Sequence, residues 1–147
     1  MKKELIRDEI AKIQQGIIND IRESRERMAT SADIDENEPI DPEDLSRQNE
    51  LGTMATRLRF MLEKAERDLE DFLDISLEQA DVVQQGALVK TDSYVFYVGI
   101  AVHPFDMEGA HVVSISQEAP IFMAMRGKTA GDSFTLAGKE YQILSVE

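Results

Sequence analysis

The sequence contains no cysteine and no tryptophan, and it has only two histidines, His103 and His111. A chain without thiols forms neither disulfides nor cysteine-ligated metal sites, and the two histidines lack the spacing of a paired metal site. No stretch approaches the roughly 20 consecutive apolar residues that a membrane-spanning helix requires, and the charged N-terminus lacks the apolar core of a signal peptide. We therefore expect a soluble, cytoplasmic protein without a membrane partner.

Acidic residues outnumber basic ones, 29 against 16, and the formal net charge is −13. Because phosphates repel such a chain, we expect no sequence-specific DNA binding. Hydrophobic residues make up 42% of the chain and charged residues 31%, a combination that is too apolar for disorder and fits long helices with solvated faces. A protein partner with basic surfaces suits this charge better than duplex DNA does.

Apolar residues recur at helical spacing near the N-terminus. Steps of three, four or their sum predict one apolar stripe along an amphipathic helix. Gly16 lies within this helix and costs about 1 kcal/mol relative to alanine, so the helix requires a packed partner. The predicted stripe consists of Ile6, Ile10, Ile13, Ile17, Ile21 and Met28.

A second apolar seam provides that partner. Its steps alternate between four and three, as in a heptad repeat, and they predict a helix from about Leu45 to Leu73 that is about 40 Å long. Pro39 and Pro42 interrupt regular helix between the two stripes, so the chain is expected to turn there and form an antiparallel hairpin. The predicted seam consists of Leu51, Ala55, Leu58, Leu62, Ala65, Leu69 and Phe72.

The apolar pattern changes from helical to alternating after residue 75. Short β-branched and aromatic runs separated by glycine, proline and aspartate predict strands, and Pro120 with Gly127 marks the start and stop of one short helix. We therefore predict an α+β protein with a hairpin at 1–75, a linker at 76–85 and a small β-rich domain at 86–147. The five predicted strands lie within 86–90, 94–102, 111–116, 132–136 and 139–146.

The last third of the chain has a pattern of a serine-containing strand, a short helix that starts at proline, Gly-Lys, Gly-Asp and two strands. This pattern resembles that of the bacterial Gre transcript-cleavage factors, GreA and GreB. This resemblance implies a coiled-coil hairpin followed by an FKBP-like C-terminal domain that docks on RNA polymerase. The residues that carry it are Ser114, Ser116, Pro120, Ala124, Gly127, Lys128, Gly131, Asp132, Gly138, Tyr141 and Ile143.

The resemblance also implies a function for the acidic turn at 33–44. In Gre factors the hairpin enters the secondary channel of RNA polymerase and places two acids beside the catalytic Mg²⁺, so that the polymerase cleaves its backtracked RNA. By register from the second helix, that pair falls near Glu38 and Asp41. The chain would then be an accessory factor rather than an enzyme. It would bind no cofactor alone and would share the Mg²⁺ of the polymerase active site.

Two further sets of residues are candidates for contacts with partners. Arg47 and Arg57 are predicted to contact the 3′ segment of the backtracked RNA, although arginines on helices also pair with neighbouring glutamates. Pro120, Phe122 and Met123 are predicted to contact the polymerase, although methionine and phenylalanine also serve as core filler.

Three alternatives to a cleavage factor stay open. The tip is looser than the usual Gre tip and has two prolines, which also fits a noncatalytic or inhibitory homologue in the same channel. An FKBP-like domain suggests a peptidyl-prolyl isomerase, which would need an open, aromatic-lined pocket. A coiled-coil assembly module would form a stable oligomer without polymerase.

Overall fold

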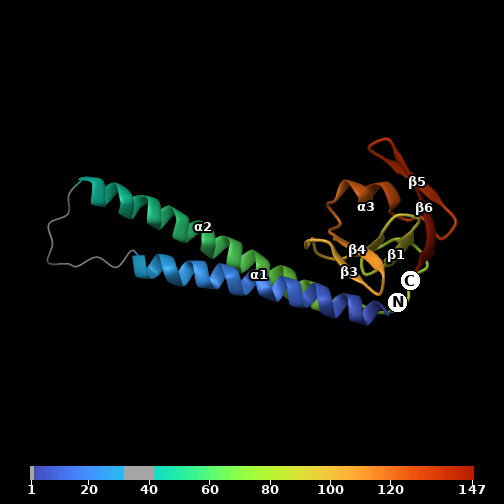
Figure 1. Ribbon diagram of the computed structural model, residues 1–147, viewed down its shortest axis with the longest axis horizontal. Coiled ribbons are helices and arrows are strands. Elements are labelled where there is room, and N and C mark those ends of the chain that lie inside the picture. Colours follow the sequence, from blue (N-terminus) through green and yellow to red (C-terminus); the bar gives the residue numbers. More distant parts are fainter. Residues whose placement is uncertain (1, 32–41) are drawn as a thin grey trace. The chain divides into compact units, whose positions relative to one another are not determined.

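The computed structural model describes residues 2–31 and 42–147. Two long helices, α1 (Lys3–Ser31) and α2 (Pro42–Leu73), precede six strands and one short helix, α3 (Pro120–Met125) (Figure 1). The predicted fold class is therefore confirmed. The chain forms two compact units, one of Gln14–Asp68 and one that combines Met1–Ile13 with Leu69–Glu147. The base of the hairpin thus belongs with the sheet, whereas the predicted boundaries followed the ends of the helices. None of the described helices is apolar over a length that could cross a membrane.

The unit Gln14–Asp68 is an antiparallel pair of helices. All of the predicted α2 seam is buried or half-buried, with Leu62 and Ala65 each 7% exposed. The predicted α1 stripe is wrong at Ile17, which is 36% exposed, because Gln14 and Ile18 are buried in its place. The buried line advances in steps of four from Ile10 to Ile18, and it passes through a polar residue that a search for apolar positions omits.

The helix α2 begins three residues earlier than predicted, at Pro42. Proline is tolerated in the first turn of a helix because the N–H groups there have no partner within the helix. Pro42 therefore starts α2 rather than interrupting it.

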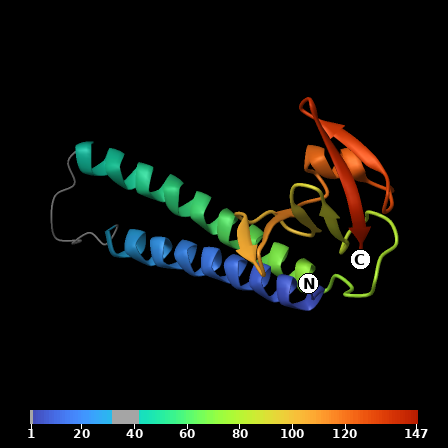
Figure 2. The same cartoon turned by 45° about the vertical axis from the view of Figure 1, so that its right-hand side comes forward.

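The second unit is built on a six-stranded sheet with the order β3-β4-β2-β1-β6-β5. Strands β2 and β4 are parallel, and every other neighbouring pair is antiparallel. The strands are β1 (Leu88–Thr91), β2 (Val95–Val98), β3 (Phe105–Met107), β4 (Ala110–Ile115), β5 (Ser133–Leu136) and β6 (Lys139–Val146). Helix α3 lies beside β5 and β6 (Figure 2).

The sequence pattern predicts five strands, and the structure has a sixth, β3. This strand has only three residues, and its middle residue is Asp106, so it lacks an apolar run. Glu108 and Gly109, with φ of 51° and 79°, connect β3 to β4 across the pair Met107 and Ala110. A two-residue turn with positive φ at both positions suits the twist of a hairpin, and glycine tolerates this conformation well.

Both faces of the sheet are covered within this unit. All four residues of β2 are buried, so alternate side chains of this strand enter two different cores. Val95 and Tyr97 belong to a core with Phe72 and with Ile6 and Ile10 of α1. The opposite core combines Phe96 and Val98 with Phe122 and Met125 of α3. The first turns of α1 and the end of α2 thus complete the β-rich unit, and residues 86–147 alone would expose one face of the sheet.

Candidate functional site

The predicted metal-positioning acids, Glu38 and Asp41, lie outside the described residues. Along the sequence, Glu43 is the nearest acid whose side chain the structure describes. It is exposed in the first turn of α2. A carboxylate at this position interacts favourably with the positive end of the helix dipole. The helix dipole alone therefore explains an acidic residue at position 43, and a metal ion is not needed to explain it.

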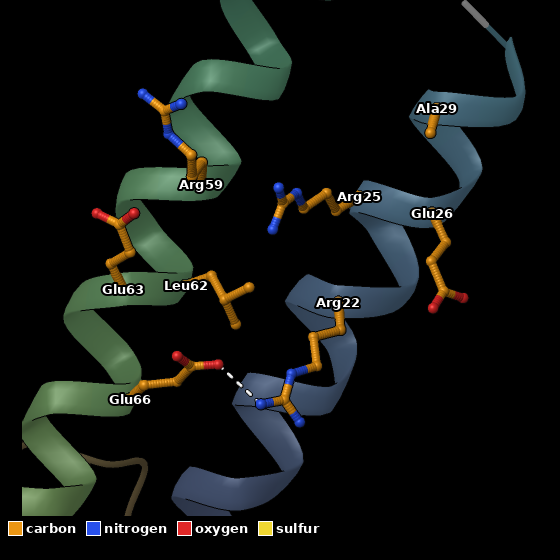
Figure 3. A pocket seen from close by; sticks show the side chains of 8 residues that line it. All are labelled: Arg22, Arg25, Glu26, Ala29, Arg59, Leu62, Glu63 and Glu66. Carbon is orange, nitrogen blue, oxygen red and sulfur yellow. Dashed lines mark hydrogen bonds and ion pairs between the residues drawn. The ribbon is translucent and has the colours of Figure 1, made fainter. Parts of the chain in front are cut away.

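An open groove of about 640 Å³ lies between α1 and α2 in the hairpin unit. Arginines from both helices line it, and Arg25 projects from α1 toward α2 (Figure 3). The guanidinium of Arg22 is paired with the carboxylate of Glu66 at 2.8 Å, and both side chains are about half exposed. The lining consists of Arg22, Arg25, Glu26, Ala29, Arg59, Leu62, Glu63 and Glu66.

Three arginines and three glutamates line this groove, so its formal charge is balanced. An exposed ion pair such as Arg22–Glu66 contributes at most about 1 kcal/mol and exchanges partners at low cost. Arg22 can therefore exchange Glu66 for another anionic group. Arg22 thus pairs across the hairpin and not with a near neighbour in its own helix.

The predicted RNA contacts, Arg47 and Arg57, lie apart from that groove. Arg57 lines a second open groove of about 410 Å³, whose walls are largely apolar. Arg47 is exposed on α2 and lines neither groove. The structure therefore separates these two residues from Arg22, Arg25 and Arg59, and RNA contact by Arg47 and Arg57 stays a prediction. The second groove is lined by Ser24, Arg27, Met28, Leu51, Met54, Arg57 and Leu58.

The predicted polymerase contacts on α3 divide into surface and core. Met123 is 66% exposed and Pro120 is also exposed, so both are available to a partner. Phe122 is 3% exposed and packs in the core of the sheet with Met125. Only Pro120 and Met123 can contact a partner directly, while Phe122 holds α3 against the sheet.

Residues that carry the Gre resemblance stabilise turns and strands of the sheet unit. Gly127 and Gly131 have φ of 76° and 91°, a conformation that glycine adopts without strain. The hydroxyl of buried Ser114 donates a hydrogen bond to the carbonyl of Ile100. The Thr129 N–H and hydroxyl donate to the Asp132 carboxylate, which lowers the pKa of Asp132 below its usual 3.8.

The two histidines do not build a metal site in the described part of the chain. Nδ1 of His111 lies 2.7 Å from the carboxylate of Asp106, directly across the β3–β4 pair. Nδ1 of His103 lies 3.2 Å from the carbonyl oxygen of Pro104. Among residues 2–31 and 42–147, no three histidine or acidic side chains are grouped as metal ligands.

Comparison with solved structures gives similarity over most of the chain. A crystal structure of GreA factor homolog 1 (Gfh1) of Thermus thermophilus matches 93% of this chain and 94% of its own, with 15% identity and a TM-score of 0.35. A structure of the transcription factor Gfh1 has 15% identity and a TM-score of 0.39, covering 93% and 92% of the two chains. Gfh1 of Thermus aquaticus has 14% identity and a TM-score of 0.35 over 91% of each chain.

The chain is similar to Gre-factor homologues. No protein-family model matches the sequence, and no curated protein matches it.

Proposed function

We propose that the chain is a cytoplasmic Gre-type elongation factor that binds RNA polymerase, inserts its hairpin into the secondary channel and stimulates cleavage of backtracked RNA. The observation that carries this proposal is the acidic connection of the hairpin. Residues 32–41 contain five acids and no lysine or arginine. They join helices of 29 and 32 residues, which are about 43 and 48 Å long at 1.5 Å per residue.

A hairpin of this length suits the delivery of carboxylates to a site that the body of the protein cannot reach. Mg²⁺ is typically bound by one or two carboxylates together with water and phosphate oxygens. Glu38 and Asp41 would supply those carboxylates, and the polymerase and the RNA would supply the other ligands. A Mg²⁺ ion held in this way would orient the attacking water and offset the charge that develops on the scissile phosphate.

Polymerase docking is assigned to the sheet unit in this proposal. Met123 presents a large flexible apolar side chain to solvent, and methionine adapts well to a protein partner. The core below it is fixed by Phe122 and Met125, so the exposed side of α3 has a rigid support. The hairpin would then act on RNA while α3 retains the factor on the polymerase.

A cleavage assay on backtracked elongation complexes tests the proposal. The unmodified chain is expected to stimulate release of short RNA 3′ fragments, and the double variant Glu38→Ala, Asp41→Ala is expected to abolish it while polymerase affinity changes at most a few fold. The matched control is Asp20→Ala, Glu23→Ala. These two acids are also three residues apart, but they are exposed on α1. Normal stimulation by the tip variant would refute the assignment of Glu38 and Asp41.

The same assay separates the proposed function from an inhibitory homologue. Two prolines in and directly after the sequence of this acidic connection, Pro39 and Pro42, favour that second candidate, since the usual Gre tip lacks them. A chain that never stimulates cleavage but displaces an active cleavage factor would be an inhibitor. A peptidyl-prolyl isomerase has less support, because Phe96, Phe134 and Tyr141 are buried in the core rather than lining an open pocket.

A further inference from the structure

One side of α2 carries a second heptad-like pattern directly beside the seam that packs on α1. Steps of three and four keep its members on the same side of the helix. We call these residues the α2 flank: Arg47, Glu50, Met54, Arg57, Met61, Lys64 and Asp68. The stretch from Arg47 to Asp68 is about 32 Å long at 1.5 Å per residue. It lies entirely within the hairpin unit.

The α2 flank exposes two large apolar side chains near its middle. Met54 is 51% exposed and Met61 is 47% exposed, one on each side of Arg57. Met54 also borders the apolar groove of about 410 Å³, whose walls include Met28, Leu51 and Leu58. Flexible methionine side chains beside an open apolar groove are typical of a surface that receives another protein.

The order of charges along the α2 flank is self-complementary when the helix is reversed. In an antiparallel pair of α2 helices centred near Arg57, Arg47 of one copy lies opposite Asp68 of the second copy. Glu50 likewise lies opposite Lys64 of the second copy. Two-fold symmetry repeats both contacts, so four pairs of opposite charge form. In the single chain, Lys64 is paired with Asp68 at 2.6 Å, whereas Arg47 and Glu50 have no ion-pair partner among the described residues.

The apolar residues of the α2 flank fit the same register. Met54 lies opposite Met61 of the second copy, and symmetry again repeats the contact. Each Met61 would insert beside the apolar groove of the other hairpin, as a side chain of a coiled coil inserts between those of the facing helix. Only Arg57 meets its own copy at the axis, and this contact of like charges opposes association.

We propose that the chain forms an antiparallel homodimer through the α2 flank, in which the two hairpins pack as a four-helix bundle. Charge complementarity selects a second copy as the partner, since the same seven residues supply both halves of every favourable contact. The dimer would cover the middle of α2. If the proposed function holds, dimerisation would compete with insertion of the hairpin into the polymerase. At high concentration, a larger share of the factor would then be dimeric and unable to insert.

Sedimentation equilibrium of the full-length chain over a wide concentration range tests dimerisation without polymerase. We expect a monomer–dimer equilibrium that Glu50→Lys or Lys64→Glu weakens about tenfold each, because like charges then face each other. The double variant Glu50→Lys, Lys64→Glu restores opposite charges and should restore association. Arg57→Gln should tighten it about threefold by removing the repulsion at the axis. Glu70→Lys is the control for charge, because Glu70 is exposed on α2 but outside the flank.

Cysteine cross-linking tests the register, because the chain has no cysteine of its own. A disulfide requires Cα atoms within about 7 Å. Arg57→Cys should therefore cross-link with itself, and a mixture of Met54→Cys and Met61→Cys chains should cross-link with each other more readily than either does alone. Glu70→Cys should stay unlinked at the same concentration. Circular dichroism of every variant identifies any that fails to fold.

The results separate dimerisation from the proposed function. Association that both charge reversals weaken and the double variant restores would support the proposal, whatever the cleavage assay shows. A chain that is monomeric at every concentration would overturn it and would leave the α2 flank to a different partner. A dimer that is indifferent to the reversals, or that links Met54→Cys mainly with itself, would overturn the antiparallel register.

Discussion

Replacement of Phe72 by alanine is expected to destabilise the sheet unit strongly. Phe72 is fully buried near the end of α2, where it joins Ile6 and Ile10 in the core below the sheet. Its ring lies edge-on to Tyr97, with centroids 5.8 Å apart and an angle of 70°. A buried phenylalanine replaced by alanine typically costs 3–5 kcal/mol, about a third of the stability of an ordinary domain. Leu73→Ala is the matched control, since Leu73 is 47% exposed and should cost less than about 1 kcal/mol.

The close approach of Gly99 to Phe72 provides a test of why Phe72→Ala is destabilising. A Cβ atom at Gly99 would lie 2.6 Å from the Phe72 ring and 3.3 Å from Tyr97. Gly99 is not among the glycines with positive φ, so Gly99→Ala should be destabilising through steric overlap, by about 1–3 kcal/mol. Removal of the Phe72 ring frees this space, and Gly99→Ala should then cost little. We expect a coupling energy of about 1–3 kcal/mol between the two substitutions.

Denaturant unfolding of the four members of this double-mutant cycle provides the test. Near-UV circular dichroism of the tyrosines reports the sheet unit, and far-UV circular dichroism reports the helices. Additive costs for Phe72→Ala and Gly99→Ala would refute the packing of Phe72 on the strand end. Equal losses for Phe72→Ala and Leu73→Ala would refute the assignment of the buried side of α2.

Two further predictions concern polar groups of the sheet unit. The hydroxyl of Tyr97 is buried without a hydrogen-bond partner among the described residues, so Tyr97→Phe should leave stability unchanged or raise it by up to about 1 kcal/mol. A clear loss in denaturant unfolding would show that the hydroxyl is bonded. Because hydrogen bonds lower the pKa of Asp132 below 3.8, its carboxylate stabilises the fold at neutral pH, and this contribution disappears as the pH falls through the folded pKa. The melting temperature of Asp132→Asn should therefore be below that of the unmodified chain at pH 7 and approach it as the pH falls below 3.8 and through the lowered pKa. A gap that does not change with pH would contradict the argument.

The sequence was informative wherever a periodic pattern specified burial. The α2 seam repeats over seven positions, and such a repeat requires a packed partner, so the hairpin followed from spacing alone. The short helix followed from Pro120 and Gly127, whose backbone preferences are local. Strand β3 could not be found in the same way, because pairing with β4 rather than apolar content holds its three residues in place.

The candidate sites were harder to predict, because the side of the helix on which a residue lies decides whether it is exposed and which groove it lines. Arg57 and Arg59 are two residues apart, yet they line different grooves of the hairpin. Phe122 and Met123 are adjacent, yet one is 3% exposed and the other 66%. Residue type marked Arg57, Phe122 and Met123 as candidates, whereas only the contacts of each helix decide which of them can meet a partner.

Gln14 is the residue of the hairpin core that a search for apolar positions could not find. It is 6% exposed, and its Nε2 atom donates a hydrogen bond to the carbonyl of Ala65 at 3.1 Å. A single polar residue in a helical seam fixes the register of the two helices at a cost in stability, because other registers leave it unpaired.

We therefore expect Gln14→Leu to raise the melting temperature of the hairpin slightly while it relaxes the register, seen as additional amide resonances in NMR spectra. The control is Gln15→Leu, because Gln15 is exposed and its Nε2 atom donates a hydrogen bond to Asn19 of the same helix at 3.1 Å. A loss of more than about 1 kcal/mol in Gln14→Leu would mean that the hydrogen bond to Ala65 stabilises the hairpin by more than the burial of an apolar side chain in its place. A single set of amide resonances in Gln14→Leu would instead mean that the apolar seam of α2 alone fixes the register.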